Sequence, residues 1–187
     1  MNSNKATGPA INDSVTINGT RYPVNTLPVS SVQGYHGVKP GDIDAVLNRV
    51  QRPPGSAGNY NPDWKGFYLT EDPQYAAGYT AGDDGRYKGA VVKFKLPVNA
   101  QIVDLGIPAS KLSDPATVAA LKAKYGIPPN VPLIDGLGMH NPPIVLREPT
   151  EDPPEEPNPE LIIPWNLAPY GSARPYGSVD KNGYFYR

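Results

Sequence analysis

The sequence predicts a single α+β domain with short strands and few long helices. Its 187 residues suit one domain. Glycine and proline, at 19 and 24 residues, are numerous enough to indicate many turns and loops. Hydrophobic residues still make up 39% of the chain, so it can bury a core. Strand-like and helix-like segments show no repeated β-α-β rhythm, which favours α+β over α/β.

A β-hairpin is the first predicted element. Apolar and polar residues alternate from Val15 to Val24 on both sides of the dipeptide Asn18-Gly19. Both residues of that dipeptide tolerate the positive φ that two-residue hairpin turns require. Residues 1–13 are polar, and we expect them to be disordered.

Helices are predicted where apolar residues recur at helical spacing or where capping residues occur. Residues 42–50 carry apolar side chains at positions i, i+3, i+4 and i+7. An Asp-Pro pair opens a helix at residue 72 and another over 114–125, because Asp caps a helix and Pro suits its first position. Gly126 ends the second of these helices.

Short apolar or alternating segments predict the remaining strands, and a proline-rich region predicts a loop. Residues 127–159 are rich in proline and acids, so we expect a long loop system there and not a second core. The predicted strands cover residues 66–70, 88–96, 101–105 and 161–165.

Composition excludes several classes of function. The 17 basic and 18 acidic residues give a net charge of −1, which lacks the basic excess of most nucleic-acid-binding domains. The absence of cysteine excludes disulfides and thiol catalysis, and two distant histidines disfavour a metal site. No apolar run is long enough to span a membrane, and the N-terminus lacks the apolar core of a signal peptide.

Two groups of residues in the first half of the chain could bind a ligand. His36 lies between Tyr35 and Gly37 at a predicted strand edge, where a glycine lets a ligand approach the backbone. Tyr68 and Tyr79 are separated by a strand end and a short helix, so their rings can face each other across a flat heteroaromatic ring. Taken singly, a lone histidine and spaced aromatic residues are more often structural.

A carboxylate near the C-terminus is the third candidate. Glu160 begins the last apolar segment, where an acid is often only a solvated edge charge. The acids between residues 151 and 156 are best read as a solvated loop. A fixed carboxylate at the start of a strand can instead stabilise a positive charge that develops during a reaction.

Together and in this order, these segments resemble the catalytic fragment of the diphtheria toxin family, which includes exotoxin A and cholix toxin. Near the C-terminus, Glu160-Leu161-Ile162 followed by Trp165 is similar to the catalytic Glu segment of the family. The resemblance in the first half of the chain lies in Tyr35-His36-Gly37, Lys39-Pro40-Gly41, Gly58-Asn59-Tyr60, Asp63-Trp64-Lys65-Gly66-Phe67-Tyr68, Ala76-Ala77-Gly78-Tyr79 and Gly89-Ala90-Val91-Val92-Lys93.

The resemblance implies a mono-ADP-ribosyltransferase fold with NAD as co-substrate. This fold has two packed, mainly antiparallel small sheets, with short helices around an NAD cleft. The implied catalytic residues are His36, Tyr68, Tyr79 and Glu160, with Glu160 as the catalytic carboxylate. No metal is implied.

The resemblance also assigns roles in NAD binding. His36 would bind the adenosine-side ribose, and the backbone of Gly37 would bind the nicotinamide carboxamide. Tyr68 and Tyr79 would sandwich the nicotinamide ring, while Trp64 would lie on a loop that affects access. The complete implied NAD-binding set is Tyr35, His36, Gly37, Trp64, Tyr68, Ala76 and Tyr79.

The implied function is that of a toxin or effector domain, secreted or delivered into the cytoplasm of a target cell. The best single acceptor is diphthamide on eukaryotic elongation factor 2. Alternatives are another protein or a nucleic acid in a competing bacterium, where a cognate immunity protein would be expected. An NAD glycohydrolase and a non-catalytic NAD-binding module also remain open.

Overall fold

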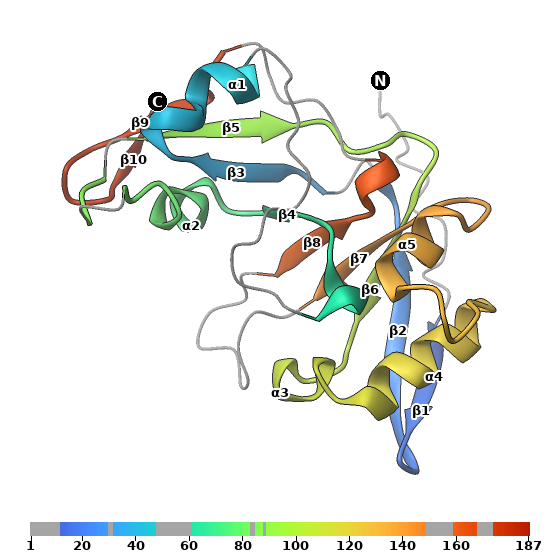
Figure 1. Ribbon diagram of the computed structural model, residues 1–187. Helices are drawn as coiled ribbons and strands as arrows, with labels where there is room; N and C mark the ends of the chain where they lie inside the picture. The colour runs from blue at the N-terminus through green and yellow to red at the C-terminus, as the bar shows by residue number, and fades with distance from the viewer. Residues whose placement is uncertain are drawn as a thin grey trace, which may run out of the picture.

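The computed structural model describes residues 12–29, 32–47, 61–82, 85–87, 89–148, 159–167 and 174–187 (Figure 1). The strands of this part are β1 (Asn12–Ile17), β2 (Thr20–Leu27), β3 (Gly34–Val38), β4 (Phe67–Thr70), β5 (Ala90–Phe94), β6 (Gln101–Leu105), β7 (Ile144–Glu148), β8 (Glu160–Ile163), β9 (Gly177–Val179) and β10 (Phe185–Tyr186). The helices are α1 (Ile43–Leu47), α2 (Pro73–Gly78), α3 (Ala109–Leu112), α4 (Pro115–Tyr125) and α5 (Leu133–Gly138). Short 3₁₀ helices are η2 (Pro40–Asp42), η3 (Pro62–Trp64) and η4 (Trp165–Leu167).

The strands form one hydrogen-bonded sheet and not the two separate sheets that we expected. Their order is β1-β2-β6-β7-β8-β4-β3-β5-β9-β10. The junction between β4 and β3 is narrow, because Tyr35 and Thr70 form its one register pair. Figure 1 shows β3 and β5 lying at a steep angle to β2, β6 and β7. The sheet therefore bends at this junction into two differently oriented halves.

The predicted hairpin is confirmed. Asn18 and Gly19 have φ values of 48° and 80°, so both adopt the left-handed conformation that the turn requires. Across the hairpin, Val15 pairs with Tyr22. Residues 1–11 of the N-terminal segment that we expected to be disordered lie outside the described residues, while residues 12 and 13 belong to β1.

The predicted helices are confirmed as α1, α2 and α4, and the predicted strands as β4, β5, β6 and β8. Side-chain oxygens of Asp72 and Asp114 accept hydrogen bonds from the first turns of α2 and α4, at 2.8 and 2.9 Å. Gly126 ends α4 with a φ of 65°. Residues 48–50 of the first predicted helix lie outside the described residues. The last predicted strand begins one residue early, at Glu160, and ends at Ile163.

The prediction of a loop over residues 127–159 is wrong for residues 133–138 and 144–148, and it holds for the turns at residues 127–132 and 139–143. This region contains α5, whose Leu133 and Ile134 are fully buried, and β7, which lies inside the sheet. Its prolines flank these elements and do not interrupt them, since Pro132 precedes α5 and Pro143 precedes β7. Residues 149–158 lie outside the described residues.

Two further strand features differ from the prediction. β6 and β7 pair in parallel, and their connection carries α3, α4 and α5, so the fold contains one crossover of the β-α-β kind that we did not expect. The short strands β9 and β10 pair at one edge of the sheet. We predicted no strand in that glycine- and tyrosine-rich segment, because two- and three-residue strands leave no period to detect.

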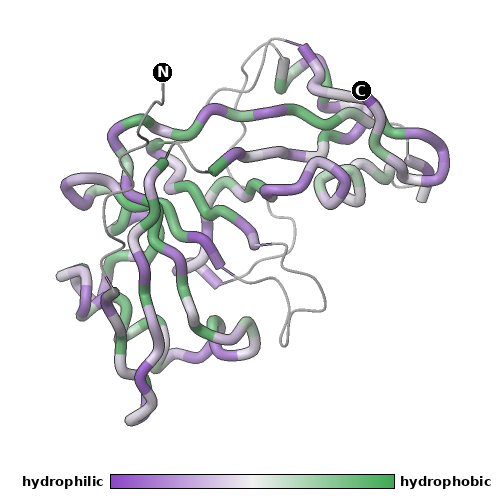
Figure 2. The backbone as a smooth tube through the Cα atoms, turned by 180° about the vertical axis from the view of Figure 1, so that it is seen from behind, coloured by the Kyte–Doolittle hydropathy of each residue, from purple (hydrophilic) through white to green (hydrophobic). Residues whose placement is uncertain are grey.

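Alternation along the strands separates two hydrophobic cores. Leu146 of β7 and Ile162 of β8 pack in the core with α4 and α5, whereas Val145 and Leu161 pack in the core on the opposite face. Hydrophobic segments accordingly follow the central strands in Figure 2, and hydrophilic segments follow the outer turns. The same alternation decides which polar side chains share a face at the strand ends.

Candidate active site

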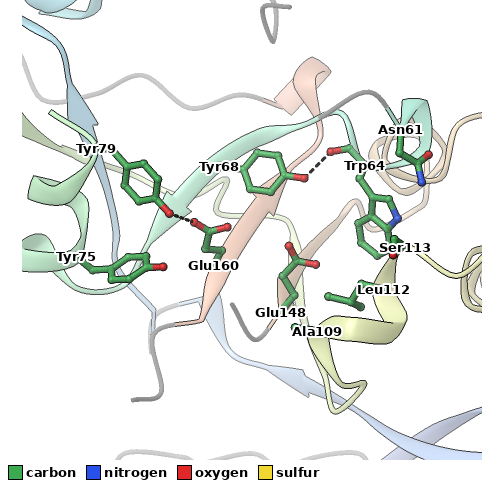
Figure 3. Close-up of a pocket in the computed structure, with 10 residues that line it drawn as sticks. All are labelled: Asn61, Trp64, Tyr68, Tyr75, Tyr79, Ala109, Leu112, Ser113, Glu148 and Glu160. Carbon is green, nitrogen blue, oxygen red and sulfur yellow. Dashed lines mark hydrogen bonds between the residues drawn. The ribbon is translucent and has the colours of Figure 1, made fainter. Parts of the chain in front are cut away.

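A pocket of about 300 Å³ opens at the ends of β7 and β8, between the end of α2 and η3 (Figure 3). This volume is at the lower end of the range for small-ligand pockets. The pocket brings together four of the residues predicted from the sequence: Trp64, Tyr68, Tyr79 and Glu160. Its described lining consists of Asn61, Trp64, Tyr68, Tyr75, Tyr79, Ala109, Leu112, Ser113, Glu148 and Glu160.

Strand register places two carboxylates in this pocket. Glu160 is the first residue of β8, and it pairs with Glu148, the last residue of β7. On its other side Glu160 pairs with Thr70 at the end of β4. Because Leu146 and Ile162 lie two residues inward on the same face, both carboxylates extend the face that carries the α4 and α5 core. Figure 3 shows both side chains directed into the space between Tyr79 and Trp64.

Tyr79 holds one oxygen of Glu160. Its hydroxyl donates a hydrogen bond to Oε1 of Glu160 over 3.1 Å. Burial raises the pKa of Glu160, and the hydrogen bond from Tyr79 opposes that rise. Burial is also the main reason that the pKa of Tyr79 is raised, so the phenol stays neutral and remains a donor. Tyr79 is 51% exposed, which places its ring at the rim of the pocket.

Close packing of α2 on β3 sets the position of Tyr79. Tyr79 caps the C-terminus of α2, and its backbone N–H donates to the carbonyl of Ala76 over 3.1 Å. A Cβ atom on Gly37 of β3 would lie only 2.0 Å from that carbonyl oxygen. Glycine at position 37 therefore allows the end of α2 to approach the sheet closely enough to bring Tyr79 to Glu160.

Substituting Gly37 by Ala is expected to displace the end of α2. The added methyl group overlaps the Ala76 carbonyl, so we expect a loss of about 1–3 kcal/mol in the free energy of unfolding, as for other overpacked sites. Urea denaturation measures this loss. Gly41, where an added Cβ meets nothing within 4 Å, provides the matched control, and Gly41→Ala should cost much less. Equal losses in the two variants would contradict the packing role.

Backbone anchoring fixes the opposite wall of the pocket. The hydroxyl of Tyr68 donates to the carbonyl oxygen of Trp64 over 2.6 Å. Asp63 accepts a hydrogen bond from the backbone N–H of Leu133 over 2.9 Å, and it forms a 2.7 Å ion pair with Lys122. These contacts tie η3 to α4 and α5. The indole of Trp64 is 4% exposed, and its buried Nε1–H has no hydrogen-bond partner among the residues that the structure describes.

His36 lies behind the pocket wall and does not line it. Its Nδ1–H donates to the backbone carbonyl of Tyr68 over 3.0 Å, and its ring packs 5.1 Å from the ring of Phe67. Burial lowers the pKa of His36, with the hydrogen bond to Tyr68 acting in the opposite direction, so the imidazole is neutral. In this position His36 holds the main chain of β4 at Tyr68.

Tyr35 and Ala76 also lie outside the pocket lining. Ala76 belongs to α2 and is completely buried where this helix packs on the sheet. The hydroxyl of Tyr35 donates to Gln33 over 2.8 Å, and its ring lies 5.0 Å from that of Tyr176. The structure thus divides the sequence-predicted residues into four that line the pocket and four (Tyr35, His36, Gly37 and Ala76) that lie in the wall or core behind it.

A comparison with protein families identifies the group to which this architecture belongs. The diphtheria toxin C domain family matches residues 24–140, which is more than half of the chain. The chain belongs to this family. The matched range contains Trp64, Tyr68 and Tyr79, whereas Glu148 and Glu160 follow it on β7 and β8. The chain is therefore a toxin-like domain. The two pocket carboxylates, Glu148 and Glu160, lie beyond the range that the family matches.

Sequence reasoning missed Glu148, which is the second acid that lines the pocket. Glu148 is half-buried, and burial followed by the charge of Glu160 raises its pKa to about 8. The signal was its place two residues after Leu146, on the same face of a strand. That signal was hidden because we interpreted residues 127–159 as a loop.

Tyr75 is a second lining residue that we did not predict. It lies one helical turn before Tyr79, and the two rings meet edge to face with their centroids 5.7 Å apart. Tyr75 therefore supports the ring at the rim of the pocket. Among the residues that the structure describes, no group of three or more His, Cys, Asp or Glu side chains could hold a metal ion.

Proposed function

We propose that this chain is an NAD-dependent mono-ADP-ribosyltransferase with the ADP-ribosyltransferase fold. One observation carries the proposal: Glu160 is held by Tyr79 in a pocket that Tyr68 and Trp64 complete. Membership of the diphtheria toxin C domain family suggests transferase activity of this kind. NAD would supply the ADP-ribose unit and a nicotinamide leaving group.

The pocket residues fit the nicotinamide–ribose half of NAD. The rings of Tyr68 and Tyr79 offer apolar faces to a flat cationic ring. The indole of Trp64 forms part of the same wall and adds apolar surface beside these rings. Glu160 offers acceptor oxygens to a ribose hydroxyl. His36, Gly37, Tyr35 and Ala76 would contribute by positioning these walls. The NAD contacts that the resemblance implies for them stay predictions, since none of the four lines this pocket.

Glu160 would act by electrostatic stabilisation. Breaking the nicotinamide–ribose bond develops positive charge on the sugar, as in glycoside cleavage. A fixed carboxylate opposite that charge stabilises the transition state more than the ground state. Tyr79 favours the ionised form of Glu160 by donating to it, and Tyr68 keeps its ring in place through its bond to the Trp64 carbonyl.

The acceptor that we propose first is diphthamide on elongation factor 2, in the cytoplasm of a cell into which the domain is delivered. A protein or nucleic acid of a competing bacterium, with a cognate immunity protein that blocks the pocket, is the alternative. All helices in the described segments are too short or too polar to cross a membrane.

Labelled NAD added to eukaryotic and bacterial lysates in parallel tests the activity and the acceptor. We expect one protease-sensitive band of elongation factor 2 size in the eukaryotic lysate alone, and no band with Glu160→Gln. A labelled band in the bacterial lysate would indicate that the acceptor is a macromolecule of a competing bacterium. Its sensitivity to nuclease or to protease would then distinguish a nucleic acid from a protein. Nicotinamide release without any label on macromolecules would instead indicate a glycohydrolase. Absence of both label and nicotinamide release would refute the proposed activity.

Substitutions of Tyr79 separate stacking from hydrogen bonding. Tyr79→Ala should weaken NAD binding, because the ring is lost, whereas Tyr79→Phe should bind NAD almost as the unmodified protein does. The Phe variant removes the hydrogen bond that lowers the pKa of Glu160, so that pKa should rise. Activity at the acidic end of the pH profile should then fall, since less Glu160 is ionised. Calorimetry and nicotinamide release against pH measure the two effects, and equal binding losses in both variants would contradict the stacking role.

A further inference from the structure

A second carboxylate in the proposed transferase pocket has no role in the mechanism above. Glu148 lines the pocket and lies directly across the β7–β8 ladder from Glu160. Its neighbour Arg147 does not neutralise it, because Arg147 is on the opposite face of the sheet. There Arg147 forms ion pairs of 2.8 Å with Glu71 and 2.7 Å with Asp104.

Placing two acids side by side on strands is energetically unfavourable. Like charges directly opposite each other on neighbouring strands destabilise a sheet. The apolar positions further along the same face, Leu146 and Ile162, show that an apolar residue would fit this face of the strand pair. A purely structural account therefore gives no reason for an acid at position 148.

The surroundings of Glu148 differ from those of Glu160. Tyr79 donates a hydrogen bond to Glu160 and favours its ionised form. Glu148 lies on the other side of Glu160 from Tyr79, toward the wall that contains Leu112 and Ser113 (Figure 3). Two carboxyl groups in different environments can take different roles in one reaction, one ionised and one able to exchange a proton.

We infer that Glu148 is the general base of the reaction and takes the proton from the acceptor nucleophile. This inference rests on the proposed transferase function. The nicotinamide–ribose bond breaks with its electron pair leaving on nicotinamide, and an acceptor oxygen or nitrogen forms the new bond to the ribose carbon. The proton of that acceptor passes to the carboxylate of Glu148 and from there to solvent. Water is the acceptor when no macromolecule is present.

The charged and titratable groups around Glu148 define the expected pH dependence. Burial and the charge of Glu160 raise the pKa of Glu148 to about 8, close to the pH at which a general base is most effective. The base is ionised above that pH, so nicotinamide release should rise as the pH passes through about 8. The described titratable groups that face the same pocket are Glu160 from β8, Tyr75 and Tyr79 from the α2 segment, and Tyr68 from β4, and no described Lys, Arg or His lines it.

The experiment compares nicotinamide release by the unmodified protein and by Glu148→Gln, with water or sodium azide as acceptor. Removing a general base lowers a rate by about 10²–10⁴. With water as acceptor we therefore expect Glu148→Gln to release nicotinamide at least a hundredfold more slowly, and its rate should not rise near pH 8. Azide carries no proton to remove. It should therefore restore the rate of Glu148→Gln and give ADP-ribosyl azide, detected by mass spectrometry. Asp135→Asn, an acid-to-amide change at an exposed position on α5, is the matched control and should keep the original rate.

Two measurements that do not depend on catalysis complete the test. Calorimetry should show unchanged NAD affinity in Glu148→Gln, and carboxyl NMR should show one glutamate that titrates near pH 8 in the unmodified protein alone. An unchanged rate in Glu148→Gln, a lost rate that azide does not restore, or an ordinary titration of Glu148 would overturn the inference. If Glu148→Gln does not fold, the pH profile and the NMR titration of the unmodified protein test the inference on their own. Failure of the unmodified protein to release nicotinamide would refute the proposed function itself.

Discussion

Replacing Glu160 by Gln is expected to slow nicotinamide release by about 10²–10³ while leaving NAD affinity nearly unchanged. Glutamine has almost the same shape, and its side-chain oxygen can still accept the hydrogen bond from Tyr79. The change therefore removes the negative charge and little else. That charge contributes mainly in the transition state, where the sugar becomes positive, so the loss should fall on the rate and not on binding.

Isothermal calorimetry and a nicotinamide-release assay distinguish these two effects. The exposed Asp135→Asn variant controls for a general effect of losing one acid, and its rate should match that of the unmodified protein. A loss of NAD affinity as large as the loss of rate would show that Glu160 binds the ground state. It would then be wrong to assign Glu160 as the catalytic carboxylate.

The elements that sequence analysis predicted correctly have strong local signals. The Asn18-Gly19 turn and the capping acids Asp72 and Asp114 determine backbone conformation within a few residues, and each was found in the predicted place. β7 was missed because its five residues lie in a proline-rich region and its stability comes from pairing with β6 and β8. Such distant pairing leaves no local pattern in the sequence.

The residues of the site also divide into those that the sequence could predict and those whose position depends on pairing between strands. Tyr68, Tyr79 and Glu160 could be selected from resemblance, and the structure places them in one pocket. The position of His36 behind Tyr68 could not be foreseen, because it depends on the bend of the sheet where β3 meets β4. Glu148 was missed for a related reason, since its place beside Glu160 depends on the register in which β7 pairs with β8.

Glu148 should also make the stability of the fold depend on pH, and this effect is the largest that we expect on folding. The pKa of Glu148 is raised from 4.5 to about 8 by burial and by the charge of Glu160. The folded state therefore binds the proton more tightly than the unfolded state. The stabilisation of the folded state by protonated Glu148 is fully present below about pH 4.5 and is lost as the pH rises through about 8.

The size of the loss follows from the same shift. At 1.36 kcal/mol per pKa unit, the free energy of unfolding should fall by up to about 5 kcal/mol across this window, a large part of the net stability of an ordinary domain. Glu148→Gln cannot titrate, so its stability should lack this fall and exceed that of the unmodified protein at alkaline pH. Urea denaturation of both proteins across the window measures the difference, with Asp135→Asn as the control.

Parallel stability curves for the unmodified protein and Glu148→Gln would contradict this account of the pocket. Glu148 would then ionise as readily in the folded as in the unfolded protein, and neither its burial nor its place opposite Glu160 would carry an electrostatic cost. Diverging curves would show that the fold gives up stability at neutral and alkaline pH to keep a second acid beside Glu160. Such a cost is typical of residues whose placement serves chemistry and not folding.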